Sequence, residues 1–112
     1  MEAKTVSKNT GISARKMRAV VDLVRGKSVN DALTILKFTP TPHARIVARA
    51  VKTAAADAEK VHNATIDNLK IVQISADEAA TLRRYRARAR GRAGSIHRRS
   101  SHITVVVGDQ EA

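Results

Sequence analysis

Two stretches near the start of the chain carry apolar side chains at helical spacing. The first fills positions i, i+3, i+4 and i+7 with Met17, Val20, Val21 and Val24. Ser13 precedes this stripe as an N-cap residue, and Gly26 follows it where a left-handed residue can end a helix. The second helix is expected to begin at Ser28 and to stop at Thr39 and Pro40. Its stripe consists of Val29, Ala32, Leu33 and Leu36.

A third and longer helix is predicted from Thr41, as the capping residue, to about His62. Pro42 would occupy the first helical position, where its missing N–H does no harm. The expected inner face consists of Val47, Ala50, Val51, Ala54, Ala58 and Val61. So many alanines indicate that this helix packs close to its neighbours.

After Asn63 the pattern changes to the β-branched residues of strands. Leu69–Ala76 and Ile103–Val107 are the predicted strands, and a short stretch at Lys4–Lys8 is also β-like. If the two strands pair antiparallel with Ile71 opposite Val107, the chain turns near Ala89, and Gly91 and Gly94 lie just beyond. The elements predict a single α+β domain over residues 1–112. Its globular part would comprise about 1–78 and 100–112, with an extended basic hairpin at about 79–99.

Charge makes the hairpin the most informative segment of the chain. The 112 residues contain 21 Lys and Arg against 10 Asp and Glu, a net charge of +11. Between Arg83 and Arg99 there are eight Arg and no acid, so the rest of the chain carries only +3. Such a charge favours a polyanionic partner, either nucleic acid, an anionic membrane surface or an acidic protein.

In an extended hairpin, the arginine side chains alternate with small ones. One face would carry Arg84, Arg86, Arg88, Arg90 and Arg92. The other would carry Tyr85, Ala87, Ala89, Gly91 and Ala93. Side chains on one face of a strand repeat every ~6.6–6.8 Å, comparable to the spacing of successive phosphates. A helix would split the arginines between two faces, and a solvated basic tail would not lie between two strands, so the extended interpretation is favoured over both.

Other kinds of chemistry find little support. Cysteine is absent, the four histidines (His43, His62, His97, His102) lack metal-ligand spacing, and Asp77 and Glu78 would face opposite sides of a strand. No phosphate loop or nucleophile motif is present, so neither an enzyme nor a metal or other cofactor is expected. No apolar run reaches the roughly 18 residues that span a bilayer, and the N-terminus resembles no signal peptide, so a cytoplasmic protein is expected.

The chain contains two aromatic residues, Phe38 and Tyr85. Phe38 is expected in the core, whereas for Tyr85 stacking on RNA and packing on the hairpin remain open.

A second basic patch is predicted beside the first helix. It consists of Lys4, Lys8, Arg15, Lys16, Arg18, Arg25 and Lys27. The helical members fall largely off the apolar stripe, so they point outward. Contact with phosphates and a solvated helix face are both open interpretations of this patch.

Three segments resemble the L22 family of ribosomal proteins from the bacterial large subunit. They are Ser13–Arg18, Leu23–Lys27 and the stretch from Arg83 to Val107. The last contains Arg83, then Arg88-Ala89-Arg90-Gly91-Arg92, then His102-Ile103-Thr104-Val105-Val106-Val107. The chain departs from common members at Arg86, Ala87 and Gly94.

The resemblance implies three helices packed on a small antiparallel sheet, with a long protruding β-hairpin. It implies a cytoplasmic ribosomal protein that binds 23S rRNA as a monomer beside other large-subunit proteins and aids assembly. The tip, Arg88, Ala89, Arg90, Gly91, Arg92 and Ala93, would line the exit tunnel and face the nascent polypeptide, and Leu82–Arg84 would lie in the part linked to macrolide response. The implied rRNA contacts combine the patch above with Arg83, Arg84, Arg86, Arg88, Arg90, Arg92, Arg98 and Arg99.

Two other classes compete with this interpretation. A DNA-architectural protein also uses basic β-arms, but such arms insert apolar or proline wedges, and neither Pro nor a large aliphatic residue lies between Arg83 and Ser95. A membrane-surface module needs an amphipathic basic helix with bulky apolar residues, where this segment has alanines.

Overall fold

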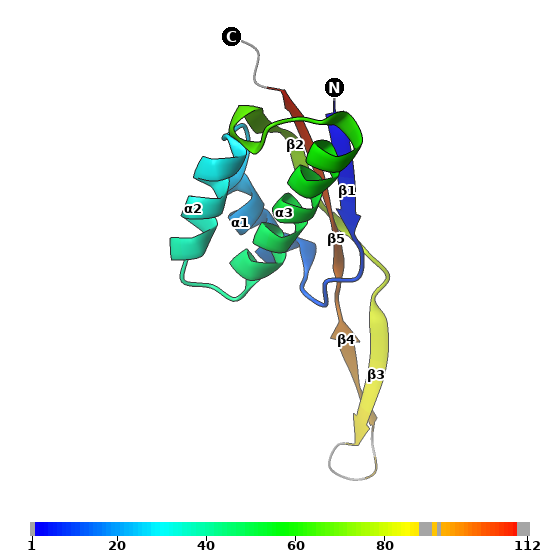
Figure 1. The fold of residues 1–112 in the computed structure, drawn as a ribbon. Coiled ribbons are helices and arrows are strands. Elements are labelled where there is room, and N and C mark those ends of the chain that lie inside the picture. The colour runs from blue at the N-terminus through cyan, green and yellow to red at the C-terminus, as the bar shows by residue number, and fades with distance from the viewer. Residues whose placement is uncertain (1, 88–90, 92, 110–112) are drawn as a thin grey trace.

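The computed structural model describes residues 2–87, 91 and 93–109 and confirms the predicted α+β architecture. Figure 1 shows three helices on one face of a sheet, with a narrow two-stranded arm projecting from one end of it. The elements in chain order are β1 (Glu2–Ser7), α1 (Ala14–Val24), α2 (Val29–Phe38), α3 (His43–His62), the single 3-10 turn η1 (Ile66–Asn68), β2 (Leu69–Glu78), β3 (Leu82–Ala87), β4 (Ala93–Arg98) and β5 (Ser101–Asp109). The principal extents of 66 × 26 × 17 Å reflect the length of the arm.

The sheet is antiparallel in the order β1-β5-β2, so β5 is its central strand. Ile71 pairs with Val107, as predicted, and the register shifts by one residue between Ile71 and Gln73. This irregularity lets Ile71 and Ile74, three residues apart, both point into the core, where each is almost fully buried.

The arm continues the two neighbouring core strands. β3 pairs with β4 from Leu82 opposite Arg98 to Ala87 opposite Ala93. Extended backbone is therefore confirmed for these twelve residues, and the helical alternative is wrong for them. The predicted turn position, Ala89, lies outside the described residues. Gly91 has a φ of +72°, which fits the backbone freedom expected of it at the reversal.

Hydroxyl caps begin the first two helices, as predicted. The Ser13 hydroxyl accepts a hydrogen bond from the Lys16 N–H, and Ser28 does the same for Asp31. Gly26 follows α1 with a φ of +77°. The prediction for α3 was off by one residue, because the helix starts at His43 and Pro42 itself stands at the cap with helical dihedral angles and no side-chain hydrogen bond.

Valine, alanine and isoleucine make up most of the core, and the predicted stripe of α1 is buried along its whole length. The predicted stripe of α3 is buried except at its last member, Val61, which is 71% exposed. Phe38 was also predicted wrongly, since it lies on the face of α2 opposite the stripe and is 75% exposed. The Lys37 ammonium lies 5.8 Å from the centre of its ring.

Candidate nucleic-acid interface

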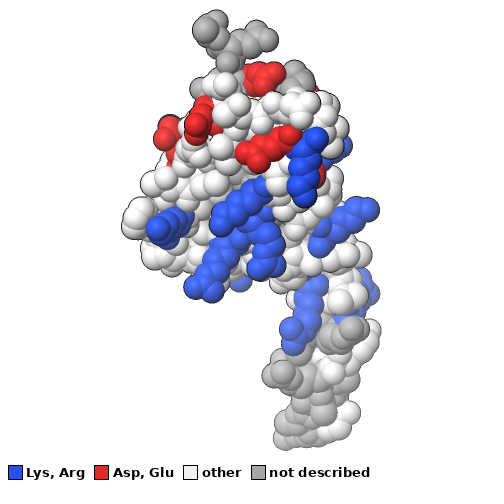
Figure 2. Space-filling view, viewed as in Figure 1, with Lys and Arg blue, Asp and Glu red and all other residues white. Residues whose placement is uncertain are grey.

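Charge is distributed unevenly along the long axis of the molecule. Figure 2 shows most of the visible Lys and Arg over the part of the helical face nearer the arm and on the arm itself, with a few beside the acidic side chains farther up. The Asp and Glu side chains visible in this view gather at the opposite end of the globular part. A polyanion would therefore meet the arm and the adjoining half of the body first.

The junction between arm and body, here called the neck, is fixed by a buried hydroxyl. Ser101 is fully buried, and among the described residues no other polar side chain is. Its hydroxyl donates to the Ile12 carbonyl over 2.7 Å, so the Thr10 hydroxyl is the donor in the 2.8 Å contact between the two side chains. The Thr10 N–H also donates to the Ser101 carbonyl over 3.0 Å. These bonds tie the loop before α1 to the start of β5.

Neighbouring residues extend this network across the neck. The Ser100 hydroxyl accepts from the Gly11 N–H, and the Ser100 carbonyl accepts from the Ala79 N–H, both over 3.0 Å. His102 Nδ1 accepts from the Asn9 N–H over 3.1 Å, near the base of the hairpin. The strands entering and leaving the arm are thus held against the loop that starts α1.

The neck brings the two predicted basic patches together. A hollow of about 780 Å³ opens between α1 and the arm, and Lys16, Arg98 and Arg99 line it. A second hollow of about 500 Å³ is lined by three cations, Arg15, Arg83 and Arg99, and by one carboxylate, that of Glu78. Arg99 and three further residues border both hollows. Cations from the start of α1 and from both arm strands therefore face one continuous region.

Arg18 and Arg25 have a structural task that the sequence did not reveal. Arg18 Nε donates to the Ala76 carbonyl and Arg25 Nη2 to the Ile74 carbonyl, each over 3.1 Å. Both carbonyls belong to β2, an edge strand of the sheet. The two arginines therefore cover backbone acceptors that would otherwise be open to another strand. Each guanidinium has five donor hydrogens, so donors remain for a further ligand.

The other predicted contact residues are less clustered. Lys4, Lys8 and Lys27 are exposed, and they lie outside the lining of both neck hollows. Arg84 and Arg86 belong to β3. The tip residues Arg88, Ala89, Arg90 and Arg92 lie outside the described residues, and Ala93 begins β4.

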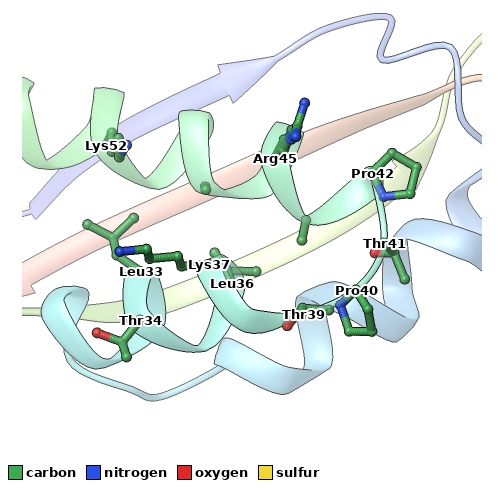
Figure 3. A pocket seen from close by; sticks show the side chains of 12 residues that line it. Leu33, Thr34, Leu36, Lys37, Thr39, Pro40, Thr41, Pro42, Arg45 and Lys52 are labelled. Carbon is green, nitrogen blue, oxygen red and sulfur yellow. The ribbon is translucent and has the colours of Figure 1, made fainter.

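Sequence analysis missed a further basic surface on the helical layer. A groove of about 970 Å³ lies between α2 and α3, and it is lined by Leu33, Leu36, Lys37, Arg45 and Lys52 (Figure 3). Arg45, Arg49 and Lys52 follow the i, i+4, i+7 spacing of one helical face. That spacing is the sequence signal for this surface.

The described part of the chain offers no group of three or more side chains that could hold a metal ion. Its helices include none with the length and apolarity to cross a membrane.

Comparison with known proteins identifies the family. Residues 5–108 match the model of the family described as ribosomal protein L22p/L17e. The chain is 53% identical over 109 residues to the large ribosomal subunit protein uL22 of Dehalococcoides mccartyi, which covers 97% of this chain and all of that protein. It is 47% identical to the protein of that name from Thermoanaerobacter pseudethanolicus, over 99% of this chain and all of the relative. For Halothermothrix orenii the identity is 44%, over 99% of this chain and 98% of the relative. The chain therefore belongs to the ribosomal protein L22p/L17e family.

Proposed function

We propose that this protein is a structural, non-catalytic component of the large ribosomal subunit, in the cytoplasm, and that it binds 23S rRNA through the neck and the arm. Family membership supports the ribosomal role, since the relatives are named as large ribosomal subunit proteins. The contact surface for rRNA would comprise the start of α1, the two hollows of the neck and the arginines of β3 and β4. Other large-subunit proteins are expected neighbours.

One observation carries the assignment of rRNA binding to this surface. Arg15, Lys16, Arg83, Arg98 and Arg99 come from three separate segments and line two adjoining hollows. Assembling so many like charges is unfavourable in the free protein, because each repels the others. Bound phosphates would neutralise these charges and so remove the repulsion between them. Each phosphate can also accept two hydrogen bonds from one guanidinium group.

The arm has a second proposed role that rests on resemblance to the family. Its tip, from Arg88 to Ala93, would line the nascent-peptide exit tunnel, and the globular part would lie nearer the exit. The slender two-stranded arm supports this, since a narrow element can pass between RNA segments that would exclude a globular domain. The same geometry would let the arm link rRNA segments that are distant in sequence and so aid assembly.

The test of rRNA binding is a salt titration with transcribed 23S rRNA. The variant Arg15→Ala/Lys16→Ala/Arg99→Ala should bind less tightly than the native chain, and its salt slope should be shallower by ~2, at about 0.7–0.9 per lost phosphate contact. The matched control is Lys37→Ala/Lys60→Ala/Lys70→Ala, which removes three exposed cations outside the neck. If both variants lost affinity equally, binding would be a matter of net charge, and the neck would have no special part in it.

A further inference from the structure

The larger hollow of the neck has the dimensions and lining of a ligand site. Its volume of about 780 Å³ falls within the roughly 300–1,000 Å³ typical of small-molecule pockets. Ile12 and Leu82 give it an apolar wall, and Lys16, Arg98 and Arg99 give it positive charge. No carboxylate belongs to its described lining. A ligand that fits must therefore combine an anionic part with an apolar surface.

His43, the first residue of α3, also borders this hollow. Its Nδ1 is buried and has no hydrogen-bond partner among the described residues. A buried nitrogen without a partner is unfavourable. A half-turn of the imidazole keeps its shape and exchanges Nδ1 with a ring carbon. His43 borders the hollow, so a polar edge of a ligand there lies within reach of its ring.

The walls of the hollow are set before any ligand arrives. On one side, the loop leading to α1 is held by the Ser100 and Ser101 hydrogen bonds. On the other side stands Leu82, whose side chain is 51% exposed although it is large and apolar. A half-exposed leucine facing a preformed wall leaves room for a flat group between them.

We infer that this hollow receives one unpaired nucleotide of RNA, an inference that rests on the proposed rRNA binding. The base lies against Ile12 and Leu82, and its polar edge meets His43. The adjoining phosphates meet Lys16, Arg98 and Arg99. Bases within a duplex are stacked and cannot enter, so the site selects a nucleotide that is bulged or splayed out of its helix.

The experiment uses the full chain and two short RNA duplexes. One carries a single bulged fluorescent adenine analogue, and the other has the same sequence without the bulge. The native chain should bind the bulged duplex about tenfold more tightly, as burial of part of one base against aliphatic side chains allows. The bound analogue should also become shielded from acrylamide quenching, because it lies inside the hollow.

Two variants and two matched controls locate the effect. His43→Ala and Leu82→Ser should abolish the preference for the bulge while the unbulged duplex binds as before. His62→Ala, at the far end of the same helix, and Val61→Ser, also an exposed apolar residue, should keep it. Should His43→Ala fail to fold by circular dichroism, Leu82→Ser alone decides, because its side chain is half exposed.

Each remaining outcome has one meaning. Equal affinity of the native chain for both duplexes, or a bulge preference that survives both hollow variants, overturns the nucleotide site and leaves RNA binding intact. Binding to neither duplex, nor to transcribed 23S rRNA, removes the proposed function itself. If polyglutamate binding depends on His43 and Leu82 while bulged RNA binding does not, the hollow takes an acidic peptide and the inference is wrong.

Discussion

Removing the Ser101 hydroxyl should destabilise the fold and loosen the neck. The side chain is fully buried, and its hydroxyl donates to the Ile12 carbonyl over 2.7 Å while accepting from the Thr10 hydroxyl over 2.8 Å. Ser101→Ala deletes both bonds. The Thr10 hydroxyl also lies 3.4 Å from the Ile12 carbonyl and can still donate to it, so the expected cost is that of two lost hydrogen bonds, about 1–3 kcal/mol in free energy of unfolding. For a domain of this size, that loss lowers the Tm by roughly 5–15 °C.

Urea unfolding followed by circular dichroism measures the loss of stability, and amide exchange at Thr10 and Gly11 locates it. Both N–H groups donate across the neck, so they should exchange faster in the Ser101→Ala variant. The control is Thr53→Ala, which also removes a hydroxyl bonded to a carbonyl, that of Arg49 over 2.9 Å, but on an exposed helix surface. Its effect should stay within about 0.5 kcal/mol. If Ser101→Ala were no more harmful than this control, the buried hydroxyl would not hold the neck.

Three further predictions concern the sheet edge, a helix end and the tip. Arg18→Ala should lower the free energy of unfolding by about 1 kcal/mol in urea titrations, because the Ala76 carbonyl loses its donor; a neutral result would show that solvent replaces the guanidinium without loss. Gly26→Ala should lower the free energy of unfolding by about 1 kcal/mol in the same assay. The φ of Gly26 is +77°, which an alanine adopts only with strain, and the added methyl group would meet nothing within 4 Å, so the backbone strain is the whole cost. Arg88→Ala/Arg90→Ala/Arg92→Ala should leave the Tm nearly unchanged. The slope of log K for rRNA binding against log salt concentration should become shallower by ~2, at about 0.7–0.9 per lost phosphate contact. A large fall in Tm would show that the tip is part of the core.

Local signals in the sequence were sufficient for the helices, the main strands and the arm. Ser13 and Ser28 cap the helices they were expected to cap, because capping depends on the few residues that follow. The pairing of Ile71 with Val107 followed from matching two β-branched runs around a basic connection. The run of arginines between Arg83 and Arg99 indicated an arm outside the core, since so many guanidinium groups cannot be buried together.

Features that depend on contacts between distant segments were not predictable in the same way. The hydrogen bonds of Ser101 join residues about ninety positions apart, and a serine in a polar stretch gives no hint of burial. Phe38 was expected in the core because it is aromatic, but its angular position on α2 directs it to solvent. The donation of Arg18 to β2 likewise depends on how α1 crosses the sheet edge, which no local pattern encodes.

The connection of the arm to the sheet has a mechanical consequence. β2 and β5 are neighbours in the sheet, and each continues directly into one strand of the arm, β3 and β4. Tension applied at the far end therefore draws both core strands in the same direction, so it produces little shear between them. To come free, the pair would have to slide as a unit past β1 and the helices that cover it. The packing of the whole hydrophobic core therefore resists a force that pulls on the arm.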